Sequence, residues 1–97
     1  MSTEVIEKPE IKTRICPMYK VIMHNDDVTS MEFVIKILVT IFNKELPDAS
    51  KIMLEIHTTG AGLAGVYALE HAELKVEQAH SLARTRNFPL TCSIEPA

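Results

Sequence analysis

The spacing of apolar residues changes several times between residues 18 and 95, and each change marks a different secondary-structure element. Residues 18–24 alternate between apolar and polar side chains, which is the period of a half-buried strand. In residues 30–43 and 47–59, apolar side chains instead recur at intervals of three and four, which is the period of a helix with one apolar face. Such a chain must fold as short strands covered by helices.

Short motifs mark where these helices begin and end. Thr29 and Glu32 have the spacing of a capping box, which predicts the start of the first helix. Pro47 suits the first turn of the second helix, and Gly60 suits the left-handed conformation that ends many helices. Two helices therefore follow the first strand in succession.

The C-terminal half of the chain continues with a strand, a helix and a strand. Residues 62–67 form a short apolar run, and residues 90–95 alternate as the first strand does. A third helix between them is predicted from a stripe of small and apolar residues, namely Leu69, Ala72, Val76, Ala79 and Ala83. The predicted fold class is α+β, with a three-stranded antiparallel sheet packed against three helices in the order βααβαβ.

Composition limits the chain to one domain with an N-terminal extension. A length of 97 residues with 46% hydrophobic content is enough for one core but too little for two. Residues 1–17 combine many charged side chains with Pro9 and Pro17, and they carry few large apolar groups. We therefore expect a flexible extension over residues 1–17 and a core domain over residues 18–97.

Charge, hydropathy and cysteine content exclude several classes of function. The formal net charge is −3 and the ten basic residues are scattered, so we expect no nucleic-acid partner. The longest largely apolar stretch, residues 33–42, is far shorter than the roughly 20 residues that span a bilayer, so we expect no membrane contact. Cys16 and Cys92 lack the pattern of a disulfide scaffold, and the N-terminus lacks a secretory signal pattern; both predict the cytoplasm.

The densest polar cluster is His24-Asn25-Asp26-Asp27, where the first strand ends and before the first helix begins. Loops held by rigid elements are common binding sites, although the same residue types also favour turns and helix caps. His57, near the end of the second helix, is placed either to complement the helix dipole or to contact a ligand. The cluster alone does not decide between these roles.

These residues suit binding better than catalysis. Asp26 and His57 are capable of acid–base chemistry, so a small hydrolase stays open as an alternative, but no serine or cysteine lies in a nucleophile motif. A metal site built from His24, Asp26, Asp27 and His57 lacks the spacing of the common metal motifs. We expect no metal and no cofactor.

Several motifs in a fixed order resemble one family. Tyr19-Lys20-Val21 followed by NDDVTSMEFV at residues 25–34 resembles the ClpS pattern YKVxxxNDDxTPMEFV. The match continues through IMLEIH at 52–57, GVY at 65–67, AELKV at 72–76 and FPLTC at 88–92. The resemblance covers residues 18–95, which is nearly the whole predicted core domain.

The resemblance implies a non-enzymatic adaptor. ClpS-like proteins bind N-degrons, which are substrates whose first residue is Phe, Leu, Tyr or Trp, and dock on the N-terminal domain of a ClpA-type AAA+ unfoldase that feeds ClpP. Carried over by position, the residues that hold the substrate's α-amino group are Asn25, Asp26 and His57. Those that line the side-chain pocket are Thr29, Met31, Val34, Met53, Ile56 and Leu90.

The same resemblance implies where the unfoldase binds. Glu70 and Lys75 match the positions that the family uses to meet the unfoldase, and residues 1–17 match its delivery segment. The chain departs from the family at Val28, Ser30, Ala68 and Leu74, where an aromatic residue, a proline, a helix-capping hydroxyl and a threonine are common. We expect a monomer. A structural module of ribosomal-stalk type stays open as a second alternative because it is also a compact α+β unit.

Overall fold

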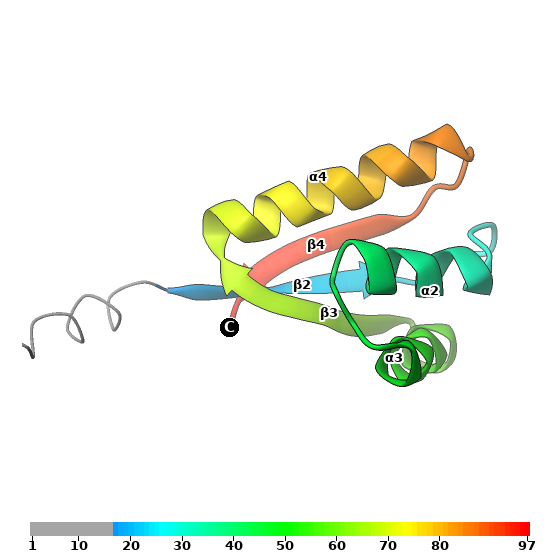
Figure 1. The fold of residues 1–97 in the computed structure, drawn as a ribbon, viewed down its shortest axis with the longest axis horizontal. Coiled ribbons are helices and arrows are strands. Elements are labelled where there is room, and N and C mark those ends of the chain that lie inside the picture. Colours follow the sequence, from blue (N-terminus) through cyan, green and yellow to red (C-terminus); the bar gives the residue numbers. More distant parts are fainter. Residues whose placement is uncertain (1–16) are drawn as a thin grey trace, which may run out of the picture.

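The computed structural model describes residues 17–97, and within that range it contains three strands and three helices (Figure 1). They are β2 (Met18–His24), α2 (Met31–Thr40), α3 (Leu46–Thr59), β3 (Ala61–Ala68), α4 (Leu69–Thr85) and β4 (Thr91–Pro96). This order confirms the predicted α+β class and the βααβαβ succession. The predicted flexible extension lies, except for Pro17, outside the described residues.

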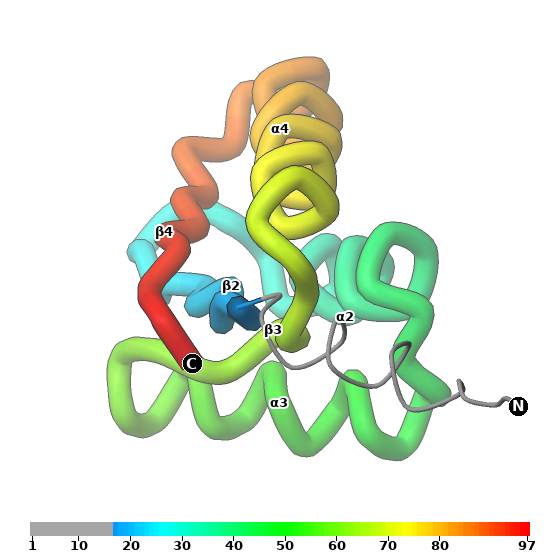
Figure 2. Tube along the Cα trace, turned by 90° about the vertical axis from the view of Figure 1, so that its left-hand side faces the viewer, coloured from blue at the N-terminus to red at the C-terminus, as the bar shows by residue number. Residues whose placement is uncertain are grey.

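The sheet has the strand order β3-β2-β4, and both pairings are antiparallel. Val21 and Met23 of the central strand are fully buried, while their neighbours in sequence are partly exposed, as the alternating pattern predicts. The register between β2 and β3 shifts at Val21 and Ile22. Figure 2 shows the three helices arranged around this sheet.

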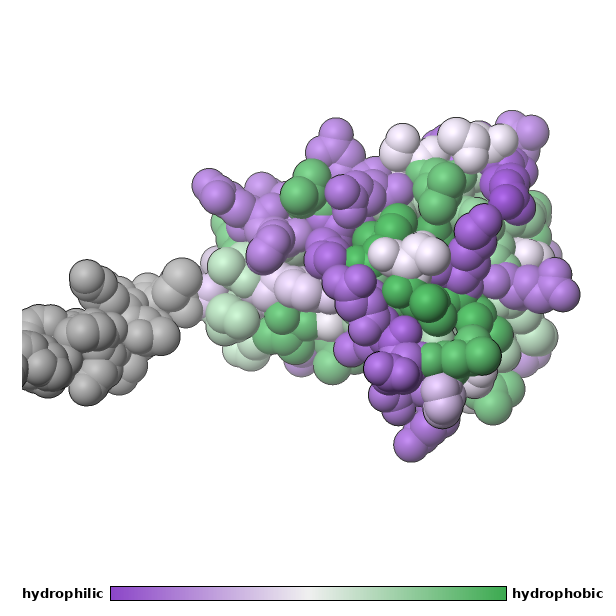
Figure 3. All heavy atoms as spheres, viewed as in Figure 1, coloured by the Kyte–Doolittle hydropathy of each residue, from purple (hydrophilic) through white to green (hydrophobic). Residues whose placement is uncertain are grey.

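The helices complete the core with different side chains. α2 contributes the bulk, namely Phe33, Val34, Ile37 and Leu38. α4 contributes Ala72, Ala79 and Ala83, whose small side chains let the helix backbone approach the sheet. Figure 3 shows mainly hydrophilic side chains over α4, with isolated hydrophobic ones between them. Within residues 17–97, no helix is long and apolar enough to cross a bilayer.

The helix ends correct two predictions. Ser30, not Thr29, caps α2, because its Oγ accepts a hydrogen bond from the Phe33 backbone N–H at 3.2 Å. The helix ends at Thr40 rather than at residue 43, and Asn43 has a positive φ of 56°. Leu69 also departs from the predicted buried stripe, since it is 41% exposed in the first turn of α4.

Other predicted boundaries are confirmed. Gly60 ends α3 in the left-handed conformation, with φ at 98°. Ala68 precedes α4 without a side-chain cap, as its lack of a hydroxyl predicts.

Candidate functional site

The loop between β2 and α2 is organised by the Asp26 carboxylate. Its Oδ1 accepts hydrogen bonds from the backbone N–H groups of Val28 (2.8 Å) and Thr29 (2.7 Å). Its Oδ2 accepts a third from Thr29 Oγ1 at 2.7 Å. A carboxylate has about four acceptor positions, so one remains for a ligand.

These contacts keep Asp26 ionised. Partial burial acts to raise its pKa, but the hydrogen bonds from Thr29 and Val28 outweigh burial and hold the pKa below the usual 3.8. Asp26 therefore carries a full negative charge at neutral pH.

A backbone contact joins this loop to the end of α3. The Asn25 N–H donates to the Gly60 carbonyl at 2.9 Å. The left-handed turn at Gly60 directs the chain from α3 into β3, so the last turn of α3, which carries His57, lies beside the loop. Residues more than thirty positions apart in sequence are thus brought together.

The loop, the start of α2 and the end of α3 enclose a pocket of about 350 Å³. Its lining residues are Asn25, Asp26, Asp27, Val28, Thr29, Ser30, Met31, Val34, Met53, Ile56 and His57. This volume is at the lower end of the range for small-ligand sites.

Part of the pocket lining is apolar. Ile56 and Val34 are 2% and 6% exposed, so they provide a buried floor. Met31 is 45% exposed and Met53 is partly buried, so these two flexible side chains form walls.

The rest of the lining is polar and negatively charged. Asp26 and Asp27 are both part of the lining, which contains neither lysine nor arginine among the described residues. Asn25 and His57 add an amide oxygen and an imidazole nitrogen, both of which accept hydrogen bonds. This part of the lining suits a cationic donor group.

The pocket brings together most of the predicted site residues but not all of them. Leu90 is 1% exposed and belongs to the core rather than to the lining. Sequence reasoning assigned no ligand contact to Asp27, Val28 and Ser30, which also line the pocket. All three lie in the same loop as the predicted contacts, and this position is the sequence signal that could have identified them as lining residues.

The two predicted unfoldase contacts lie on α4, away from this pocket. Glu70 is exposed in the first turn. Lys75 is partly buried, and its Nζ donates to the Ile41 carbonyl at 2.6 Å. The ammonium group of Lys75 is therefore already engaged within the molecule.

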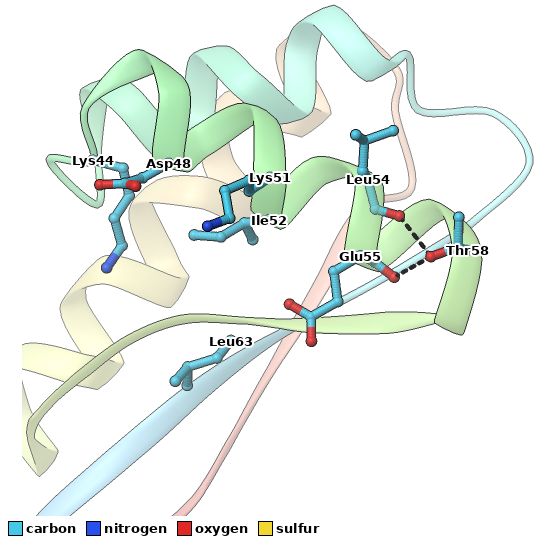
Figure 4. Close-up of a pocket in the computed structure, with 8 residues that line it drawn as sticks. All are labelled: Lys44, Asp48, Lys51, Ile52, Leu54, Glu55, Thr58 and Leu63. Atoms are coloured by element: carbon cyan, nitrogen blue, oxygen red, sulfur yellow. Dashed lines mark hydrogen bonds between the residues drawn. The ribbon is translucent and has the colours of Figure 1, made fainter.

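A larger hollow lies elsewhere, between α3 and β3, with a volume of about 750 Å³ (Figure 4). Lysines and acids alternate along it, and the Thr58 hydroxyl donates to the Leu54 carbonyl at 2.8 Å instead of facing a ligand. The Leu54 side chain points away from Leu63 (Figure 4). The polar groups that line this hollow do not converge on one point, so the smaller pocket is the better candidate site.

The described residues offer neither a metal cluster nor a reactive thiol. Among residues 17–97, no three His, Cys, Asp or Glu side chains gather in a way that would hold a metal ion. His24 is hydrogen-bonded to Ser93 Oγ, with its Nε2 at 2.7 Å. Burial raises the pKa of the Cys92 thiol to about 12, so this cysteine is no nucleophile at neutral pH.

Comparison with known proteins identifies the family. The family model described as "ATP-dependent Clp protease adaptor protein ClpS" matches residues 14–93. The chain belongs to the ClpS family. Its members are adaptors rather than enzymes, which confirms the non-enzymatic prediction.

Individual relatives of this ClpS chain agree over most of its length. The "ATP-dependent Clp protease adapter protein ClpS" of Desulfatibacillum aliphaticivorans is 50% identical over 93 residues, covering 96% of this chain and 89% of the relative. That of Desulforapulum autotrophicum is 52% identical over 88 residues, covering 91% and 85%. The structure of Agrobacterium tumefaciens ClpS2 bound to L-phenylalaninamide has a TM-score of 0.81 and 32% identity, covering 84% of this chain and 99% of that one.

Proposed function

We propose that this ClpS chain binds the N-terminal residue of N-degron substrates, namely Phe, Leu, Tyr or Trp. The observation that carries the proposal is a single pocket whose lining combines hydrogen-bond acceptors with buried apolar side chains. Phenylalaninamide, the ligand named for the Agrobacterium relative, has a free α-amine beside an aromatic side chain and so combines the same two groups.

The polar part of the pocket lining accounts for recognition of a free N-terminus. An α-ammonium group has donors only, so it needs acceptors and a compensating negative charge. Asp26 supplies the charge and its free acceptor position, while His57 and Asn25 line the same pocket and supply an imidazole nitrogen and an amide oxygen. An internal phenylalanine has no such ammonium group and is excluded.

The apolar part of the pocket lining accounts for the preference for a large first side chain. Burying a large side chain against Val34 and Ile56 contributes about 1.5–3 kcal/mol. Each charge-assisted hydrogen bond at the ammonium group contributes a similar amount. Both parts of the lining are therefore needed for useful affinity, and an N-terminal glycine has no side chain to bury against the apolar part.

The bound substrate is then delivered to a protease in the cytoplasm. The proposed recipient is a ClpA-type AAA+ unfoldase working with ClpP, and the adaptor acts as a monomer. Glu70 is exposed on α4 and available to the unfoldase's N-terminal domain. Residues 1–17 serve as the delivery segment.

The test is titration with a Phe-first peptide and its N-acetylated twin, followed by calorimetry. We expect binding of the free amine only, with the peptide recovered intact. Equal binding of both peptides would refute recognition of the N-terminus, and cleavage would instead support a hydrolase.

Selectivity among first residues is assigned to Met31. A side chain branched at Cβ is stiff about χ1, so its second heavy atom cannot turn away from a wall close to the amine site. We therefore expect weak binding of Val- and Ile-first peptides. Met31→Ala removes the wall, whose clash costs about 1–3 kcal/mol, and should therefore raise affinity for an Ile-first peptide by about 5- to 150-fold. An unchanged Phe-to-Ile ratio in fluorescence titrations would refute this role.

A further inference from the structure

Gly62 of β3 lies against α3 with no side chain between them. It is buried, and it pairs with the fully buried Met23 of the central strand, so its missing side chain belongs to the covered face of the sheet. A Cβ placed on Gly62 would lie 2.8 Å from Ile56 Cγ1. Real Cβ atoms essentially never come this close to another atom, so α3 and β3 approach each other here more closely than any other residue would permit.

The need for glycine at this position is steric rather than conformational. Of the three glycines in the chain, only Gly60 has a positive φ, so the Gly62 backbone adopts a conformation that is open to other residues. The same Cβ would lie 3.4 Å from the Ile52 carbonyl oxygen and 3.5 Å from Ile52 Cγ2, which are ordinary van der Waals distances. Ile56 alone therefore excludes a side chain at residue 62.

Ile56 separates Gly62 from the pocket of about 350 Å³ described above, which we call the degron pocket. Ile56 is one of its lining residues, whereas Gly62 is not. A side chain branched at Cβ in a helix is stiff about χ1, so Ile56 cannot rotate away from an added atom. Since Ile56 is almost fully buried, the degron pocket is the open space beside it, and a displaced side chain moves there.

The displacement is large enough to change the shape of the pocket. In Gly62→Ala, the distance from the added Cβ to Ile56 Cγ1 must rise from 2.8 Å to at least 3.4 Å, so Cγ1 must move by about 0.6 Å. Protein interiors are packed about as densely as organic crystals, so they transmit such a shift rather than absorb it. The δ-methyl group of Ile56, which is bonded to Cγ1, would move with it and make the degron pocket shallower.

We propose that Gly62 determines the largest first side chain that the degron pocket accepts, because its missing side chain lets Ile56 lie back from the pocket. The inference rests on the proposed function and deepens it. Gly62 is a positioning residue, since it acts on the substrate only through Ile56. Trp-first substrates, which have the largest side chain, depend most on this depth, and Leu-first substrates depend least on it.

The neighbouring close contacts of β3 do not reach the degron pocket. Ile52 lines the larger hollow between α3 and β3 instead, so it has open space on that side (Figure 4). A Cβ on Gly65 would meet the ring of Tyr67, which is also absent from the lining of the degron pocket. Of the two glycines in β3, Gly62 is thus the one that is coupled to the first side chain of a substrate.

The test compares the full-length parent with Gly62→Ala in fluorescence titrations with Trp-, Phe- and Leu-first peptides. The ratio of Trp to Leu affinity should fall by about tenfold in Gly62→Ala, because one methylene in a tight apolar pocket changes discrimination by about 10- to 200-fold. Gly65→Ala is the matched control, since it adds the same atom to the same strand away from the pocket. An unchanged ratio in folded Gly62→Ala, or an equal fall in Gly65→Ala, would overturn the proposal.

Ile56→Val provides a rescue, because it removes the δ-methyl group that Gly62→Ala would push into the pocket. Alone it should raise the Trp-to-Leu ratio, and combined with Gly62→Ala it should return the ratio toward that of the parent. A merely structural role for Gly62 would weaken binding of all three peptides together and leave the ratio unchanged. If thermal unfolding shows that Gly62→Ala is not folded, the double variant is compared with Ile56→Val, and equal ratios in these two would overturn the proposal.

Peptide binding by the parent separates this inference from the proposed function. Where the parent binds a Phe-first peptide but not its N-acetylated twin, an unchanged Trp-to-Leu ratio in Gly62→Ala refutes only the role of Gly62. Failure of the parent to bind any peptide with a free α-amine would refute the proposed function itself.

Discussion

Asp26→Asn separates two roles that one carboxylate combines. In the parent, Oδ1 accepts two backbone hydrogen bonds and Oδ2 accepts one from the Thr29 hydroxyl. The asparagine amide oxygen is able to accept both backbone bonds, and its NH₂ group donates to the Thr29 hydroxyl in reverse. The loop geometry should therefore persist, while the negative charge and the free acceptor position for a ligand ammonium are lost.

The expected loss of affinity follows from that single missing contact. A hydrogen bond to a charged group contributes about 1.5–3 kcal/mol, which corresponds to about 10- to 150-fold in the dissociation constant. Asp26→Ala should lose at least as much, since it also removes the three bonds that order the loop.

Calorimetric titration with a Phe-first peptide at pH 7 measures this loss. Asp27→Asn is the control, because Asp27 is exposed and its substitution removes the same charge from the same loop. It should cost less than about threefold, in keeping with the small effect of exposed charges. Thermal unfolding verifies that Asp26→Asn is folded, and a folded variant with parental affinity would refute Asp26 as the ammonium acceptor.

Three further predictions concern the pH dependence of stability, helix capping and the pocket lining. Burial, together with the charge of Arg84, holds the pKa of His80 below its usual 6.5, and its Nε2 accepts from the Cys92 N–H at 2.9 Å. The contribution of His80 to the free energy of unfolding should therefore be complete above pH 6.5 and decrease below it, by at most about 1.4 kcal/mol per pH unit. Urea unfolding of His80→Gln should lack this pH dependence. An equal pH dependence in both proteins would contradict the prediction. Ser30→Ala should cost about 1 kcal/mol and lower Tm by about 4–8 °C, whereas an unchanged Tm would mean that the cap is dispensable. His57→Ala should weaken binding of a Phe-first peptide because it removes one hydrogen-bond acceptor from the pocket lining, and parental affinity in fluorescence titrations would contradict that role.

Local patterns predicted the elements because each pattern has a local cause. The alternation that buries Val21 and Met23 is fixed by the pleat of a strand, and Gly60 is needed because few other residues adopt its φ of 98°. The helix start was less certain because Thr29 and Ser30 are both good caps. The structure uses Ser30 since the Thr29 hydroxyl is bound to Asp26.

The site was predicted by resemblance, while its organisation was not. Spacing alone left Asp26 as either a turn residue or a ligand contact, and its three hydrogen bonds place it in the first role while leaving one acceptor position for the second. The approach of His57 to this loop depends on the Asn25 to Gly60 contact, which no local pattern encodes.

For Lys75 too, the position in the sequence does not determine what the side chain contacts. Its place on α4 is the same whether the ammonium faces solvent or the protein, so the sequence does not distinguish a docking cation from a structural one. The structure adds a contact that the sequence does not encode, because a carbonyl 34 positions earlier in the chain lies 2.6 Å from the Lys75 Nζ. An ammonium group has three donors, so this bond engages one of them and leaves two. Breaking the partly buried bond would leave the Ile41 carbonyl without its donor, at a cost of about 1–3 kcal/mol. An exposed ion pair returns about 1 kcal/mol or less, so any contact that Lys75 makes with a partner is favoured to keep this bond and to use the other two donors.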